Sequence, residues 1–176
     1  MITDKSYAVP CVYEKRQEYD KASRPPIRVA VPGSKSITNR ALLLATLAQG
    51  TSTLRGVLFS DDSRHFLKCI QELGFETKVD EEKRIVQVTG LGGAVPKTEA
   101  SPYVGSAGTA ARFLTAYLGV SQGVYHMDAS EQMRRRPMAP LMASLRELGC
   151  EILCKGDEGH FPFTLKGHGF GIRLIT

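Results

Sequence analysis

The sequence contains no tryptophan and no long uninterrupted apolar run. A helix that crosses a bilayer needs roughly 18 or more consecutive apolar residues, so we expect no membrane partner. The first 26 residues are polar and lack the apolar centre of a secretory signal, and the expected location is therefore cytoplasmic. The 176 residues, of which 42% are hydrophobic and 23% charged, are otherwise typical of a globular domain.

Cysteine is also scarce. None of the four cysteines belongs to a Cys-x-x-Cys pair or to a histidine spacing typical of zinc. Cys150 and Cys154 are four residues apart, but the segment GCEILC has the apolar character of a strand. We therefore expect ordinary reduced thiols and no metal, rather than a metal site or a disulfide framework.

Acidic residues are outnumbered, 18 against 23 lysines and arginines, and the formal charge is +5. This balance indicates an anionic partner: nucleic acid, acidic lipid or a phosphorylated metabolite. The absence of tryptophan and of any RNP, KH or zinc-finger pattern argues against nucleic acid. A basic nucleic-acid binder nevertheless stays open as an alternative.

Apolar periodicity and glycine turns predict a mixed α/β chain. Ile27 to Val31 alternate as a strand, and Pro32-Gly33 then turns the chain. Ser60 is placed to cap a helix, with two aspartates after it. The predicted elements that follow are a helix at 37–50 ended by Gly50, a strand at 51–60, a helix at 60–74 and a hairpin of 75–79 with 84–90.

The same order recurs further along the chain. The second copy is predicted to have a helix at 109–123 ended by Gly123, a strand at 124–130, a helix at 137–149 and a hairpin of 150–156 with 161–167. Arg40 aligns with Arg112, Gly50 with Gly123 and Gly74 with Gly149, at offsets of 72, 73 and 75 residues. A period this long indicates duplicated βαβαββ units. The predicted organisation is a polar lead-in at 1–26, one unit at 27–100, a second at 101–170, and at 171–176 the start of a truncated third unit.

The first candidate site is the segment PGSKSITNR, where a strand, a glycine turn and a helix start follow one another. Backbone N–H groups at a helix N-terminus favour an anion. Lys35 lies at that end, while Ser36 and Arg40 are four residues apart and share a helical face. The alternative is a capped helix with solvated charges. The segment is not a Walker A loop, because serine precedes the lysine.

Two further segments carry candidate residues. The turn Gly105 to Thr109 (GSAGT) opens the second helix at the equivalent place, and Gly108 would let a ligand approach the backbone. The segment MRRRP, which contains Arg136, has three adjacent arginines and is typical of an anion clamp, or else of a solvated basic loop. Asp61 and Asp62 could ligate a metal but are better placed to cap a helix, and neighbouring His65 is interpreted as part of a helix face.

Four segments together resemble the 5-enolpyruvylshikimate-3-phosphate (EPSP) synthase family: PGSKSITNRALLLATLAQGTSTLRG, SDDSRHFLKCIQELG, GSAGTAARFLTA and MRRRPMAPLMASLRELGCE. They occur in order from about residue 27 to about residue 170. The related UDP-N-acetylglucosamine enolpyruvyl transferases share the fold but match this set of motifs less closely, and they remain an alternative. The resemblance implies a partial N-terminal domain of the enolpyruvyl transferase fold, an inverse α/β barrel.

The resemblance also implies a function. The family transfers the enolpyruvyl group of phosphoenolpyruvate to the 5-hydroxyl of shikimate 3-phosphate, releases phosphate through a tetrahedral ketal, and uses no cofactor or metal. Lys35 matches the lysine that touches both substrates, and Ser36 and Arg40 match positions that bind shikimate 3-phosphate. Gly108 and Arg136 match phosphoenolpyruvate-binding positions. Lys35 is also the expected catalytic residue. Ser106, Thr109 and Asp62 are further candidates for the same site.

The chain departs from the family pattern at several places. Ser106 stands where asparagine is usual, Phe113 where many members have proline, and Gln132 where arginine is common. Family members are more than twice as long, and their acidic catalytic residues belong to a domain that has no counterpart here. We therefore expect a chain that is inactive alone, with a non-catalytic or complementing phosphate-binding module as an alternative. Faces exposed by truncation would also permit self-association.

Overall fold

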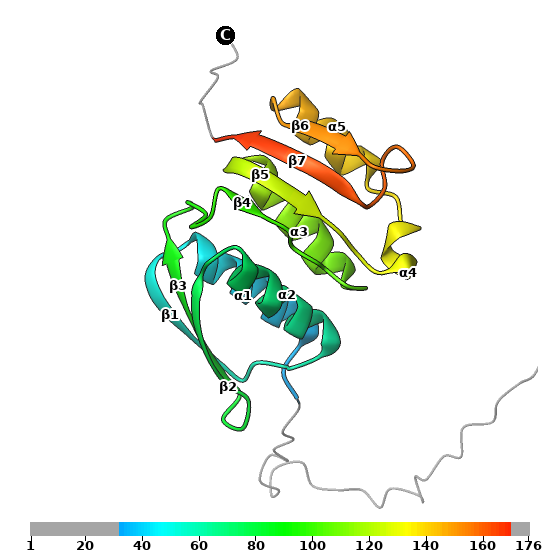
Figure 1. The fold of residues 1–176 in the computed structure, drawn as a ribbon. Helices are drawn as coiled ribbons and strands as arrows, with labels where there is room; N and C mark the ends of the chain where they lie inside the picture. The colour runs from blue at the N-terminus through cyan, green and yellow to red at the C-terminus, as the bar shows by residue number, and fades with distance from the viewer. Residues whose placement is uncertain (1–31, 170–176) are drawn as a thin grey trace, which may run out of the picture. The chain divides into compact units, whose positions relative to one another are not determined.

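The computed structural model describes residues 32–169 (Figure 1). The predicted strand at 27–31, the polar lead-in and the segment 171–176 lie outside the described residues. The elements follow one another as α1 (Lys35–Leu47), β1 (Gln49–Arg55), α2 (Asp61–Glu72), β2 (Glu76–Asp80), β3 (Ile85–Leu91), β4 (Glu99–Ala100), α3 (Gly108–Gly119), β5 (Gln122–Met127), α4 (Glu131–Arg134), α5 (Ala139–Glu147), β6 (Glu151–Cys154) and β7 (Phe163–His168). The expected mixed α/β class is confirmed.

The strands form one sheet in each half of the described chain (Figure 1). The order is β1-β3-β2 in the first sheet and β4-β5-β7-β6 in the second. In both sheets the later strand of a hairpin lies in the middle and pairs antiparallel with the strand that follows the first helix. The pairing β1-β3-β2 therefore recurs as β5-β7-β6. Strand β4 adds a short parallel edge to β5.

Helices α1 and α3 end at Leu47 and Gly119, earlier than the sequence predicted. The prediction that Gly50 and Gly123 are helix C-caps is wrong, because both lie in strands, paired with Gly90 and Gly167 respectively. Each of these partners faces helix-end carbonyls: a Cβ on Gly90 would lie 2.2 Å from the oxygen of Ala45. The glycine pair thus lets each sheet cross directly over the end of its helix, which leaves no room for another helical turn.

The helix predicted after Ser60 is confirmed as α2, and its start shows why it forms there. The hydroxyl of Ser60 accepts from the N–H of Ser63, while the Ser63 hydroxyl accepts from the N–H of Ser60 at 2.8 Å. This reciprocal capping box satisfies two backbone donors that a helix start leaves open. Asp61 and Asp62 follow in the first turn, where carboxylates complement the helix dipole.

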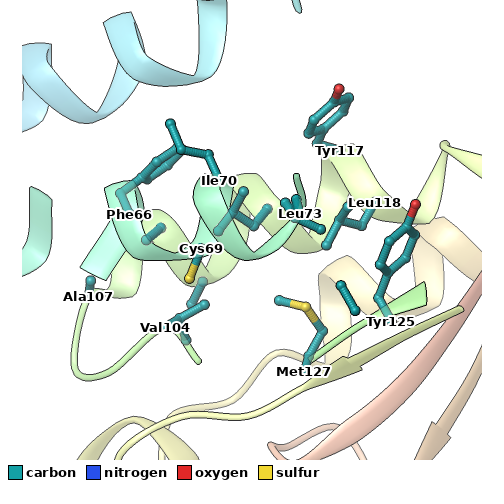
Figure 2. Packing of buried hydrophobic residues seen from close by; sticks show 14 of the residues in the cluster. Phe66, Cys69, Ile70, Leu73, Val104, Ala107, Tyr117, Leu118, Tyr125 and Met127 are labelled. Atoms are coloured by element: carbon teal, nitrogen blue, oxygen red, sulfur yellow. The ribbon is translucent and has the colours of Figure 1, made fainter. Parts of the chain in front are cut away.

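One part of the hydrophobic core lies where α2 packs against the second half of the chain (Figure 2). Phe66 and Ile70 of α2, and Leu73 at its C-cap, are fully buried in this cluster (Figure 2). Burying side chains of this size contributes about 1.5–3 kcal/mol each. The thiol of Cys69 donates to the carbonyl of Tyr103 over 3.2 Å, which ties α2 to the segment before α3. The two halves therefore share one core.

Candidate functional site

The N-terminus of α1 is built by a close approach of two backbone segments. Ser34 caps the helix by accepting from the N–H of Ile37 at 3.4 Å. A Cβ on Gly33 would lie 2.3 Å from the carbonyl oxygen of Gly56, so only glycine fits at this turn. Lys35 and Ser36 occupy the exposed first turn, which contains no acidic residue. This helix end therefore presents a positive potential to solvent.

Lys35 is held by a carboxylate from the neighbouring helix. Its Nζ lies 3.0 Å from Oδ2 of Asp62 in the first turn of α2, and the two side chains are 52% and 22% exposed. Asp62 is thus an ion-pair partner of Lys35 in this structure. Residues 32–169 contain no group of three or more histidine, cysteine or acidic side chains arranged to hold a metal.

Arg40 connects α1 to α3. Its Nη1 donates to the carbonyl of Ser36, one turn earlier, over 3.0 Å. Its guanidinium carbon also lies 5.6 Å from the ring centre of Phe113 in α3, a cation–π contact. Ser36 and Arg40 therefore share a helical face as predicted, and this face lies beside α3.

A second group of cations gathers at the N-terminus of α3. Ala107 precedes this helix without any side-chain cap, so the first backbone N–H groups are open to an anion. A Cβ on Gly108 would lie 3.1 Å from Nη1 of Arg136 and 3.3 Å from Nη1 of Arg112. Arg112 donates to the carbonyls of Gly108 and Pro137, at 3.3 and 3.4 Å. Two guanidinium groups thus flank an uncapped helix end.

The three consecutive arginines do not form the shared clamp that the sequence suggested. Arg134 forms a bidentate ion pair with Asp128, in which both carboxylate oxygens of Asp128 lie 2.8 Å from Nη2 of Arg134. Arg135 pairs with Glu131 one helical turn away. Arg136 has no carboxylate partner within 4.0 Å in the part of the chain that the structure describes. Arg134 ends the short helix α4, and of the three arginines only Arg136 lies within 4 Å of the Cβ position at Gly108.

The remaining candidates have supporting positions. Ser106 Oγ lies 2.8 Å from Oγ of Ser130, the residue that caps α4. This bond links the turn before α3 to the arginine segment. Thr109 lies half-buried in the first turn of α3. His65 packs its ring against Gly105, and its buried Nδ1 has no hydrogen-bond partner among residues 32–169.

The structure therefore assembles most of the predicted residues into two groups, one on α1 and one at α3. Lys35, Ser36 and Arg40 form the first group, and Gly108 and Arg136 lie together in the second. Sequence reasoning missed Arg112 as a site residue, although its alignment with Arg40 in the repeat was a usable signal. It also missed the contact between Phe113 and Arg40, because that contact depends on how α1 and α3 pack.

Comparisons with known proteins identify the family to which this chain is similar. Residues 21–175 match the family model described as EPSP synthase (3-phosphoshikimate 1-carboxyvinyltransferase). Over 142 residues the chain is 47% identical to the 3-phosphoshikimate 1-carboxyvinyltransferase of Trichormus variabilis, covering 81% of this chain and 33% of that protein. It is 42% identical to the Shewanella oneidensis protein of the same name, covering 80% and 33%. The chain thus spans about a third of the length of these relatives.

A solved structure supports the same likeness. The chain resembles EPSP synthase from Acinetobacter baumannii with a TM-score of 0.71 and 26% sequence identity. The similarity covers 80% of this chain and 32% of that one. Within residues 32–169, no helix is long and apolar enough to cross a membrane.

Proposed function

The chain belongs to the EPSP synthase family, and from that premise we propose that it forms part of an enzyme that transfers the enolpyruvyl group of phosphoenolpyruvate to shikimate 3-phosphate. The observation that carries the proposal is the convergence of Arg112 and Arg136 on Gly108 at the uncapped start of α3. Both substrates are anions, and charge-assisted hydrogen bonds to such groups are the strong ones. The names of the relatives favour shikimate 3-phosphate over a UDP-sugar as the acceptor.

Phosphoenolpyruvate is assigned to the group at α3. The guanidinium of Arg136 is exposed and lacks a carboxylate partner among residues 32–169, so its donors are free for a carboxylate or phosphate. Gly108 has no side chain to exclude the ligand, and the backbone N–H groups of the first turn of α3, including that of Thr109, have no side-chain cap. A Cβ at Gly108 would occupy the space in front of both arginines.

Shikimate 3-phosphate is assigned to α1. Ser36 supplies a hydroxyl and Arg40 a guanidinium on one helical face, and Lys35 precedes them at the positive helix end. We assign Lys35 the role of orienting the reacting groups of both substrates. Its ion pair with Asp62 places the ammonium group beside the first turn of α2.

The proposed reaction needs proton transfer as well as binding. The 5-hydroxyl gives up its proton as its oxygen bonds to C2 of the enolpyruvyl group, and C3 gains a proton. In the second step C3 loses a proton while the C2–O bond to phosphate breaks, so that the double bond is restored and phosphate leaves. The carboxylates beside the site are already engaged, Asp62 by Lys35 and Asp128 by Arg134. A general acid or base contributes about 10²–10⁴-fold to the rate. We therefore propose that this chain binds substrate without turning it over.

A titration tests the proposal directly. Shikimate 3-phosphate is titrated calorimetrically into the chain and into Lys35→Ala, with Lys68→Ala, an exposed lysine of α2, as the matched control. We expect micromolar to millimolar binding that Lys35→Ala abolishes and Lys68→Ala leaves intact. A folded chain that releases no heat with either substrate would contradict the proposed site, and turnover by the purified chain would contradict its inactivity.

Self-association is a further part of the proposal. Ile37 and Leu44 on α1 are 69% and 64% exposed, and Leu148 at the end of α5 is 69% exposed. Leu73, which aligns with Leu148 in the repeat, is fully buried between the two halves. Apolar positions that are covered in one unit and open in the other favour association. Sedimentation velocity should show an association that increases with protein concentration and that Leu148→Glu reduces. A chain that stays monomeric over a concentration range of about 100-fold would contradict self-association.

A further inference from the structure

Phe113 contacts the cation of another helix. Its ring lies in α3, half-buried against the core, and the guanidinium carbon of Arg40 in α1 lies 5.6 Å from the ring centre. Arg40 also donates to the carbonyl of Ser36 over 3.0 Å. The guanidinium is thus held from two sides, by its own helix and by the ring of α3.

A cation–π contact with the face of a ring uses none of the N–H donors of a guanidinium. Arg64 shows the contrasting case, since its guanidinium carbon lies 5.6 Å from the ring centre of Phe59 while both of its terminal nitrogens donate to Glu81. Arg40 has no carboxylate within 4.0 Å among residues 32–169. Its edge therefore keeps donors for an incoming anion, while the ring limits where the group can move.

We propose that Phe113 is a positioning residue for Arg40, holding the guanidinium edge free and aligned for a phosphate monoester. The proposal rests on the proposed function, because it takes Arg40 as a phosphate-binding residue. It adds that α3 controls phosphate binding on α1 through this ring. The contact also couples the two halves of the chain at the site, since α1 and α3 come from different units.

Loss of an exposed cation–π contact predicts a weakening of about two- to fivefold in phosphate-ester affinity. Phe113→Tyr keeps the ring, whereas Phe113→Leu and Phe113→Met remove it and keep apolar bulk. Phe59→Leu is the matched control, because it removes an equivalent ring from an arginine already paired with a carboxylate. Shikimate 3-phosphate and inorganic phosphate are each titrated by NMR, and a melting curve verifies that every variant is folded.

We expect Phe113→Leu to weaken shikimate 3-phosphate binding two- to fivefold while Phe113→Tyr and Phe59→Leu bind as the parent does. In an Arg40→Ala background, Phe113→Leu should have no further effect. The proposal would be overturned if Phe113→Leu bound shikimate 3-phosphate as tightly as the parent. It would also be overturned if Phe113→Leu lowered the affinity by the same factor in the Arg40→Ala background as in the parent. If Phe113→Leu does not fold, Phe113→Met decides by the same criteria.

The NMR signal of the Arg40 Nε–H separates this proposal from the proposed function. Ring currents from a stacked Phe113 displace that signal, and Phe113→Leu should return it toward the position of an unstacked arginine. A parent chain that binds neither anion would contradict the proposed function alone. The Arg40 signal would then still decide the positioning: a shift in Phe113→Leu supports it, and an unmoved signal overturns it.

Discussion

Gly108 lies directly against the guanidinium of Arg136, 28 positions later in the chain, with only 3.1 Å between Nη1 and the place of a Cβ. The contact brings together a helix start without a side chain and a cation that has no carboxylate partner in the described part of the chain. An anion at this point could accept hydrogen bonds both from backbone N–H groups and from the guanidinium group of Arg136. The arrangement is the physical basis of the proposed phosphoenolpyruvate site.

Arg136 and Arg135 provide a matched pair of charge deletions. Arg136→Ala should weaken phosphoenolpyruvate binding by at least about tenfold, since a hydrogen bond to a charged group contributes about 1.5–3 kcal/mol. Arg135→Ala removes the same charge from an exposed pair with Glu131 and should change the affinity less than about twofold. Calorimetric titration of phosphoenolpyruvate measures both. Equal losses in the two variants would mean that net charge, and not the placement of Arg136, governs binding.

Leu73 and Leu148 occupy aligned positions in the two units but differ in exposure, at 0% and 69%. Leu73→Ala should lower the free energy of unfolding by about 2–5 kcal/mol, because it opens a cavity between α2 and α3. Leu148→Ala should change it by no more than about 0.5 kcal/mol in the monomer. Urea unfolding at low protein concentration measures both values. A large loss for Leu148→Ala under those conditions would show that this side chain is covered.

Gly90 lies where strand β3 crosses the end of helix α1. A Cβ there would lie 2.2 Å from the carbonyl oxygen of Ala45 and 2.3 Å from that of Ala48. Gly90→Ala should therefore destabilise the chain by about 1–3 kcal/mol or more, as overpacking does. Gly156→Ala is the control, since nothing lies within 4 Å of its Cβ position. Thermal unfolding should separate the two clearly, and an undiminished melting temperature for Gly90→Ala would refute the close crossing.

The thiol of Cys69 should resist alkylation in the folded chain. Burial raises its pKa to about 12, and the nearby Glu72 adds to the rise. Because the raised pKa lies far above pH 8, the reactive thiolate is scarce there. Iodoacetamide labelling at pH 8, read by peptide mass spectrometry, should modify Cys154 well before Cys69. Urea should abolish the difference, and rapid labelling of Cys69 without urea would contradict its burial.

Much of the local structure could be predicted from the sequence. The start of α2 at Ser60, both hairpins and the recurrence of the unit depend on capping, turn residues and periodicity, which act over a few positions. The ends of α1 and α3, which come before Gly50 and Gly123, could not be predicted in this way. Their place is set by pairing with strands some 40 residues away, at Gly90 and Gly167.

The sequence by itself determined which charged and small residues are available, and it identified Lys35, Ser36, Arg40, Gly108 and Arg136 as candidates. Only the tertiary structure decided which of three adjacent arginines has no carboxylate partner within residues 32–169, because Asp128 and Glu131 form ion pairs with the other two. It also decided that Phe113 of α3 holds Arg40 of α1. Spacing along a chain determines which face of a helix a residue occupies, but the neighbour that meets that face depends on long-range packing.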